Sequence, residues 1–250
     1  MLQVTVARGI ATLTLDSPDD RNALSRRMRA QLRSALAEAL ADDAVRVVVL
    51  DHTGRVFCSG MDLKEATGGS SDDQGVREFP ELLQLLWSSP KPVLAVVRGP
   101  ARAGGVGLLA ACDVVVAGTS ATFAFSEVRL GLVPAVISAV VLPRMVPHIA
   151  HRLMLTGQVF DADTASAGGL VDVVVPDADV DGEVRAQLVH LTAGAPAALA
   201  ETKRLLRAGS ERLEFDELLE ISARRFAGDE GQEGIAAFRE KRAARWVPTD

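Results

Sequence analysis

The sequence has no tyrosine and only two cysteines, and this scarcity limits the kinds of protein it can form. Aromatic residues make up 4% of its 250 positions. Two thiols cannot build a disulfide framework, and their spacing does not match a metal site. Cys58 and Cys112 stand in apolar or glycine-rich surroundings, which is typical of small buried side chains. We therefore expect no disulfide-stabilised fold and no metal centre.

Long apolar runs and an excess of basic residues are missing as well. No run reaches the roughly 18 residues of a membrane-spanning helix, and no N-terminal stretch joins a basic start to an apolar segment as a secretory signal does. The 27 basic residues against 33 acidic ones leave a net charge of −6, which offers no electrostatic footprint for nucleic acid or an anionic membrane. The sequence therefore predicts a soluble, cytoplasmic protein with neither as a partner.

The chain does contain apolar strands that alternate with helices, followed by a helical end. Alternating residues at 2–6 and 10–15 predict a hairpin, and Ser25 is a candidate N-cap for a helix that ends near Ala41. Continuous apolar runs predict further buried strands at residues 45–50, 92–97, 113–117 and 171–175. Helices are predicted over residues 76–87, 183–193, 197–208, 215–226 and 230–239. The fold class is α/β with some parallel pairing, because helices separate the strands.

Two loops differ from these elements in composition. Residues 54–65 form a glycine-containing loop that is expected to turn into a short helix. Residues 67–75 lack apolar side chains and are expected to be mobile. After Gly131 the chain is expected to be helical up to the last strand.

Three glycines, Gly104, Gly105 and Gly107, connect the strand predicted at residues 92–97 to an apolar helical segment. Glycine lets a backbone approach another group closely, and the free N–H groups at a helix start favour negative charge. One interpretation is a dinucleotide site, but seven residues separate the strand from Gly105 and no acidic residue ends the next strand. Close packing of helix on sheet is a second. The third pairs these glycines with the loop at residues 57–63, so that N–H groups from both hold one oxyanion.

Short motifs follow one another in order along nearly the whole chain, at residues 21–24, 57–65, 91–99, 104–105, 112–113, 126–134, 155–157, 169–171 and 233–242. Together they resemble the crotonase superfamily, the enoyl-CoA hydratase/isomerase family. The resemblance implies a crotonase-like spiral of β-β-α units over residues 1–190. It also implies a C-terminal helical region, residues 191–250, that assembles homotrimers or homohexamers.

The same resemblance implies an acyl-CoA substrate, with coenzyme A as part of that substrate and no separate cofactor. The backbone N–H groups of Met61 and Gly104 are then the donors that hold the thioester oxygen and stabilise an enolate. The implied CoA-binding residues are Ala23, Met61, Asp62, Leu63, Lys64, Phe238 and Lys241. Of these, Lys64 would reach toward the nucleotide phosphates, and the last two often come from a neighbouring subunit.

The acid–base residues differ from the family pattern. The best-known hydratases hold two carboxylates over the substrate double bond; Glu127 matches the second, and Gly107 stands at the position of the first. Glu127 lies among apolar residues such as Phe125, where burial would raise its pKa and suit it to act as a general base. Hydration of a 2-enoyl-CoA, double-bond isomerisation by one glutamate, and CoA binding without turnover therefore remain alternatives.

Residues 104–108 and 126–138 are similar to a bacterial branch resembling methylglutaconyl-CoA hydratases, in which the first carboxylate is also absent, and this favours hydration. Arg98 and Arg102 flank the glycines and could pair with a substrate carboxylate, although two surface arginines are the simpler interpretation. His148 and His151 do not have the spacing of a complete metal site, and no G-x-S-x-G nucleophile motif is present.

Overall fold

The computed structural model describes residues 1–62, 64–65, 78–208 and 215–248. The segment expected to be mobile, residues 67–75, lies outside this part of the chain, as does Leu63. The predicted short helix does not form within the described residues up to 65, because Asp62 and Glu65 close only one turn there.

A six-stranded sheet forms the centre of the molecule, in the order β1-β2-β3-β4-β6-β9. The first two strands are the predicted antiparallel hairpin, and the other pairings are parallel. Helices connect the parallel strands, as their separation in the sequence requires. The strand bounds are β1 (Leu2–Ala7), β2 (Ile10–Leu15), β3 (Val47–His52), β4 (Val93–Val97), β6 (Val114–Gly118) and β9 (Val173–Val175).

A second sheet has the order β5-β7-β8, and the sequence did not predict it. Its strands are β5 (Ala101–Arg102), β7 (Thr122–Ala124) and β8 (Phe160–Asp161), which are too short to show a periodic pattern. The chain runs from β4 through β5 into α3, and from β6 through β7 toward α4. Each of these two turns therefore adds a strand to the large sheet, then a strand to the small sheet, then a helix, and this succession is the expected β-β-α spiral.

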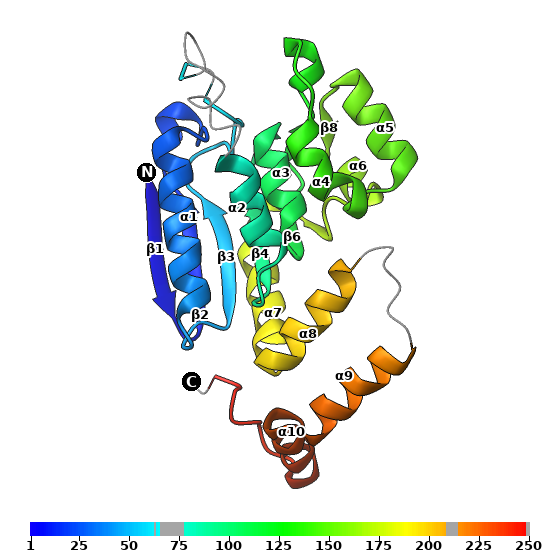
Figure 1. Ribbon diagram of the computed structural model, residues 1–250. Coiled ribbons are helices and arrows are strands. Elements are labelled where there is room, and N and C mark those ends of the chain that lie inside the picture. The colour runs from blue at the N-terminus through cyan, green and yellow to red at the C-terminus, as the bar shows by residue number, and fades with distance from the viewer. Residues whose placement is uncertain (63, 66–77, 209–214, 249–250) are drawn as a thin grey trace.

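Helices cover both faces of the large sheet (Figure 1). Val48 and Leu50 pack with residues of α1, α2, α3 and α4 in the main core, whereas Val49 packs with α7 on the opposite face. Burial on both faces explains why the central strands are continuous apolar runs. The helices are α1 (Arg26–Ala41), α2 (Glu78–Trp87), α3 (Gly104–Ala111), α4 (Ala135–Arg144), α5 (Pro147–Thr156), α6 (Ala162–Ala167), α7 (Val180–Ala193), α8 (Pro196–Arg207), α9 (Phe215–Ala227) and α10 (Asp229–Glu240), with 3₁₀ turns at Pro18–Asp20, Glu127–Leu130 and Asp177–Asp179.

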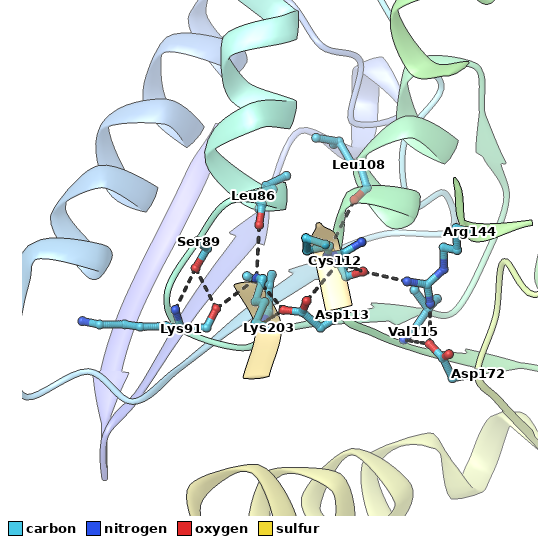
Figure 2. Close-up of polar contacts among 12 residues, drawn as sticks. Leu86, Ser89, Lys91, Leu108, Cys112, Asp113, Val115, Arg144, Asp172 and Lys203 are labelled. Atoms are coloured by element: carbon cyan, nitrogen blue, oxygen red, sulfur yellow. Dashed lines mark hydrogen bonds and ion pairs between the residues drawn. The ribbon is translucent and has the colours of Figure 1, made fainter. Parts of the chain in front are cut away.

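Helix α3 is buried along its whole length, and cations from two other helices hold its C-terminal end (Figure 2). Lys203 of α8 donates to Asp113 Oδ2 at 2.6 Å, and Arg207 donates to Asp113 Oδ1 at 2.9 Å. Arg144 of α4 donates to the carbonyl of Cys112 at 2.7 Å. Cations are favourable at a helix C-terminus because its free carbonyls carry partial negative charge. This cluster ties the C-terminal helices to α3.

We predict that Asp113→Asn lowers the free energy of unfolding by about 3–5 kcal/mol, because it leaves the largely buried Lys203 without its ionic partner. Chemical denaturation measures the change. Glu240→Gln is the control, since Glu240 pairs with Arg242 on the exposed surface and such pairs contribute little. Equal losses in the two variants would contradict the importance of the cluster.

Candidate active site

Two backbone corners converge at the N-terminal end of α3. A Cβ placed on Gly60 would lie 3.4 Å from the nitrogen of Gly104. Both corners turn through a residue of positive φ, Gly60 at +90° and Ala103 at +47°, directly before Met61 and Gly104. Among the described residues, neither the Met61 N–H nor the Gly104 N–H has a protein acceptor. The structure thus brings together the two donors expected from the sequence.

The loop that carries Met61 is held by backbone contacts on both sides. Phe57 N donates to the Pro100 carbonyl at 3.0 Å, and Arg102 N donates to the Cys58 carbonyl at 2.9 Å, which joins this loop to the strand before α3. On the other side, Leu24 N donates to the Gly60 carbonyl at 2.8 Å. These bonds fix the separation of the two corners.

Asn22 anchors the same loop from inside the protein. Its side chain is fully buried and donates to the carbonyls of Thr53 at 3.0 Å and Val56 at 2.8 Å, while its oxygen accepts from Ser17 N at 2.7 Å. A buried amide with all these partners contributes to a single loop conformation. Asn22 is therefore a positioning residue for the loop.

Cys58 explains why Gly105 is a glycine. A Cβ at Gly105 would come within 2.7 Å of the Cys58 carbonyl oxygen, so only glycine allows this approach. Burial raises the pKa of the Cys58 thiol to about 12. The thiol therefore stays protonated at neutral pH and is not a nucleophile.

Glu127 is positioned by the small sheet. Ala103 N donates to the Ala124 carbonyl at 3.0 Å, and the chain reaches Glu127 three residues later, at the start of a 3₁₀ turn. The Glu127 Oε2 atom is buried, and no hydrogen-bond partner for it is found in the part of the chain that the structure describes. Burial raises the pKa of this carboxyl above its usual value of 4.5. A carboxylate with one buried, unpartnered oxygen and a raised pKa is a candidate general base.

The expected CoA-binding strip is partly assembled. Ala23 precedes Leu24, which pairs with Met61, and Lys64 N donates to Asp62 Oδ1 at 2.9 Å. The Lys64 ammonium is largely exposed and lies 3.7 Å from Asp20. These residues share one edge of the site, whereas Leu63 lies outside the described residues. That they bind CoA stays a prediction.

Phe238 and Lys241 do not join this strip within one chain. Phe238 lies in the last turn of α10 and Lys241 is its C-cap, at the bottom of Figure 1, whereas the loop at residues 53–62 rises toward the top. Helix α10 is attached through Glu230, which accepts from Ala197 N at 2.9 Å. Their contact with CoA remains a prediction that requires a neighbouring copy.

The two arginines beside the glycines are engaged elsewhere. Arg98 pairs with Asp51 at 2.6 Å and with Asp181. Arg102 donates to the Thr122 carbonyl at 2.7 Å and to the Thr122 hydroxyl at 3.0 Å. Both guanidinium groups are thus engaged in contacts within the protein, and pairing of either with a substrate carboxylate stays a prediction.

Within the described ranges, no three His, Cys, Asp or Glu side chains gather in a way that could hold a metal ion. In the same part of the chain, no helix combines the length and apolar character needed to span a membrane.

Comparison with known proteins shows which family has this arrangement. The family profile described as "Enoyl-CoA hydratase/isomerase" matches residues 5–248. The chain belongs to the enoyl-CoA hydratase/isomerase family. A Rhodobacter capsulatus protein named "Probable enoyl-CoA hydratase" is 38% identical over 250 residues, which cover 96% of this chain and 95% of that protein. The Escherichia coli "1,2-epoxyphenylacetyl-CoA isomerase" is 32% identical over 252 residues, with 97% and 96% covered.

Solved structures confirm the crotonase-like spiral. An enoyl-CoA hydratase/isomerase from Marinobacter aquaeolei superimposes with a TM-score of 0.92 at 32% identity, covering 98% of each chain. The resemblance stated from the motifs is therefore confirmed for the family and for the fold. Membership of the methylglutaconyl-CoA branch stays a prediction.

Sequence reasoning missed Ala103, which has a positive φ directly before the Gly104 N–H. An alanine in the sequence does not indicate a positive φ, because residues other than glycine rarely adopt that backbone conformation. Sequence reasoning also missed the packing of Phe79 and Ile137 against the glycines of α3. The Gly-Gly-x-Gly pattern could have indicated a bulky neighbour, but not which residue supplies it.

We predict that Gly60→Ala lowers kcat/KM for an enoyl-CoA at least about 100-fold, the cost of losing one oxyanion donor. The new Cβ would lie 3.0 Å from the Arg102 carbonyl and would need a positive φ, so the loop must shift. Steady-state kinetics measure the loss. Gly9→Ala is the control, since Gly9 also has positive φ but lies in the β1–β2 turn; an equal loss there would contradict a specific role for Gly60.

Proposed function

We propose that this protein adds water to the double bond of a 2-enoyl-CoA thioester. The observation that carries the proposal is the convergence of two backbone N–H groups without acceptors, at Met61 and Gly104, together with a buried Glu127 Oε2 atom that has no hydrogen-bond partner among the described residues. Donors in this arrangement stabilise an oxygen that gains charge during reaction, and each contributes roughly 3–4 kcal/mol to the rate where measured. A thioester carbonyl that becomes an enolate is such an oxygen.

The proposal gives each of these groups one task. The thioester oxygen accepts from the Met61 and Gly104 N–H groups, which withdraws electrons from the double bond. Glu127 takes a proton from water as the water oxygen bonds to C3, and the electron pair of the double bond moves to give the enolate. Glu127 then returns that proton to C2, so one water is added and the carboxylate is regenerated. One carboxylate thus serves as base and then as acid.

Double-bond isomerisation is the second candidate. It needs one group that removes a proton from one carbon and returns it to another, and Glu127 with the same oxyanion donors meets that need. The Escherichia coli relative named as an isomerase shows that the family profile alone does not distinguish the two reactions. A CoA-binding protein without turnover is the non-catalytic alternative.

The binding strip supports coenzyme A as the substrate carrier. In the proposal, Ala23, Asp62, Leu63 and Lys64 bind the CoA moiety beside Met61. Phe238 and Lys241 would come from a neighbouring copy, in a homotrimer or homohexamer. No cofactor other than the CoA of the substrate takes part, and a cytoplasmic location remains the expectation.

A panel of 2-enoyl, 3-enoyl and branched enoyl-CoAs tests the proposal. Hydration is followed as loss of the conjugated thioester absorbance, and double-bond movement is followed separately by chromatography of the products. Product from 2-enoyl substrates with incorporated water supports hydration. Product from 3-enoyl substrates alone would establish the isomerase, and binding without any product would establish the non-catalytic alternative.

We predict that Glu127→Gln abolishes turnover but leaves the dissociation constant for CoA unchanged, because glutamine cannot accept a proton. In the wild-type protein, a base with a raised pKa must lose its proton to act. The kcat/KM value should therefore fall as pH drops through the raised pKa of Glu127, so that the acidic limb lies above pH 4.5. A pH–rate profile measures this limb. Retained activity in Glu127→Gln would remove Glu127 from the mechanism.

A further inference from the structure

One side of α3 is covered by hydrocarbon next to the donor at its N-terminus. Gly107 follows Gly104 by three residues and so lies on the same side of the helix, one turn further along. A Cβ at Gly104 would lie 3.3 Å from Phe79 Cζ and 3.2 Å from Leu24 Cδ1. A Cβ at Gly107 would lie 3.7 Å from Phe79 Cζ and 2.5 Å from Ile137 Cγ2. The Phe79 ring therefore contacts the surface of both glycines, and Ile137 covers the second.

The space above Gly107 is already filled. A contact of 2.5 Å between two carbon atoms is far below their van der Waals separation, so no side chain fits at Gly107 while Ile137 keeps its position. Ile137 is 3% exposed and belongs to α4, which packs on α3. Its β-branched side chain has little rotameric freedom in a helix. Ile137 thus forms a stiff apolar surface one turn from the oxyanion donor.

We infer that Ile137, with Phe79, forms the wall against which the acyl group packs, and that Ile137 determines the width of the acyl groups accepted. This inference rests on the proposed function, since it places the acyl chain beside the thioester oxygen held by Gly104. The wall favours hydrocarbon next to the thioester. A polar substituent there would lose its hydration without gaining a hydrogen bond.

Gly107 and Ile137 are in direct contact. Gly107 leaves room for the Cγ2 methyl of Ile137, and that methyl occupies the volume a side chain at Gly107 would need. Substitutions at the two positions should therefore be coupled rather than additive.

The test compares two substrates, crotonyl-CoA and its homologue with an isopropyl group in place of the terminal methyl. Ile137→Ala should raise the ratio of kcat/KM for the bulky substrate over the small one about 10-fold or more, the scale on which an apolar pocket discriminates a methylene group. Ile137→Val, a smaller deletion that is safer for folding, should shift the ratio in the same direction by less. Val140→Ala is the matched control, since Val140 is a buried residue one turn further along α4; its ratio should not change.

A second arm tests the contact itself. Gly107→Ala should reduce kcat/KM for both substrates about 10-fold or more, and adding Ile137→Ala should recover most of that loss. Additive losses in the double variant would contradict the contact.

The outcomes separate the two proposals. If the wild-type protein is active but the substrate ratio is the same in Ile137→Ala and Ile137→Val as in the wild type, the assignment of Ile137 is overturned and the proposed function stands. If the wild-type protein turns over no enoyl-CoA, the proposed function fails. The ratio of dissociation constants for butyryl-CoA and its isopropyl homologue then still tests the wall, and an unchanged ratio in Ile137→Ala overturns it.

Discussion

The approach of two backbone corners without an intervening side chain is the constraint on which the site depends. Gly60 and Gly104 come together closely enough that a Cβ on Gly60 would lie against the Gly104 nitrogen. Gly105 meets the same requirement against Cys58. The buried amide of Asn22 and the short ladder between β5 and β7 hold the corners in place. Glycine at these points is thus a requirement of packing and of chemistry at once, since the same approach exposes the two N–H donors.

Helix α3 links this constraint to the rest of the fold. Its N-terminal end presents a free N–H, and its C-terminal end receives Arg144, Lys203 and Arg207 through the Cys112 carbonyl and Asp113. The cations thus lie at the end of the helix that carries partial negative charge, and the free N–H lies at the end that favours a negatively charged group. Helix α8 thus holds the C-terminal end of α3, the helix whose first residue is Gly104, although α8 lies about 90 residues further along the chain.

Much of this arrangement could be predicted from the sequence, and the rest depends on contacts that no local pattern encodes. The long strands and the C-terminal helices were predicted closely, because burial on two faces and amphipathic periodicity leave clear signals. The small sheet was missed, since two-residue strands such as β5 and β8 have no period. The donors Met61 and Gly104 came from the family resemblance. The positive φ of Ala103 and the packing of Ile137 on Gly107 are tertiary features, visible only once α3 and α4 are side by side.

The use of backbone donors has a consequence for how this protein can evolve. At Met61, every substitution except proline keeps the N–H, because proline alone lacks it. The proposed donor at Met61 is therefore robust to mutation at its own position, while Gly60, Ala103, Gly104 and Gly105, which are closely packed or of positive φ, are not. In the proposed site, side chains such as Ile137 can change without removing either N–H group. A lineage with this fold can thus acquire new acyl specificity by changing wall residues, without rebuilding the part of the site that stabilises charge.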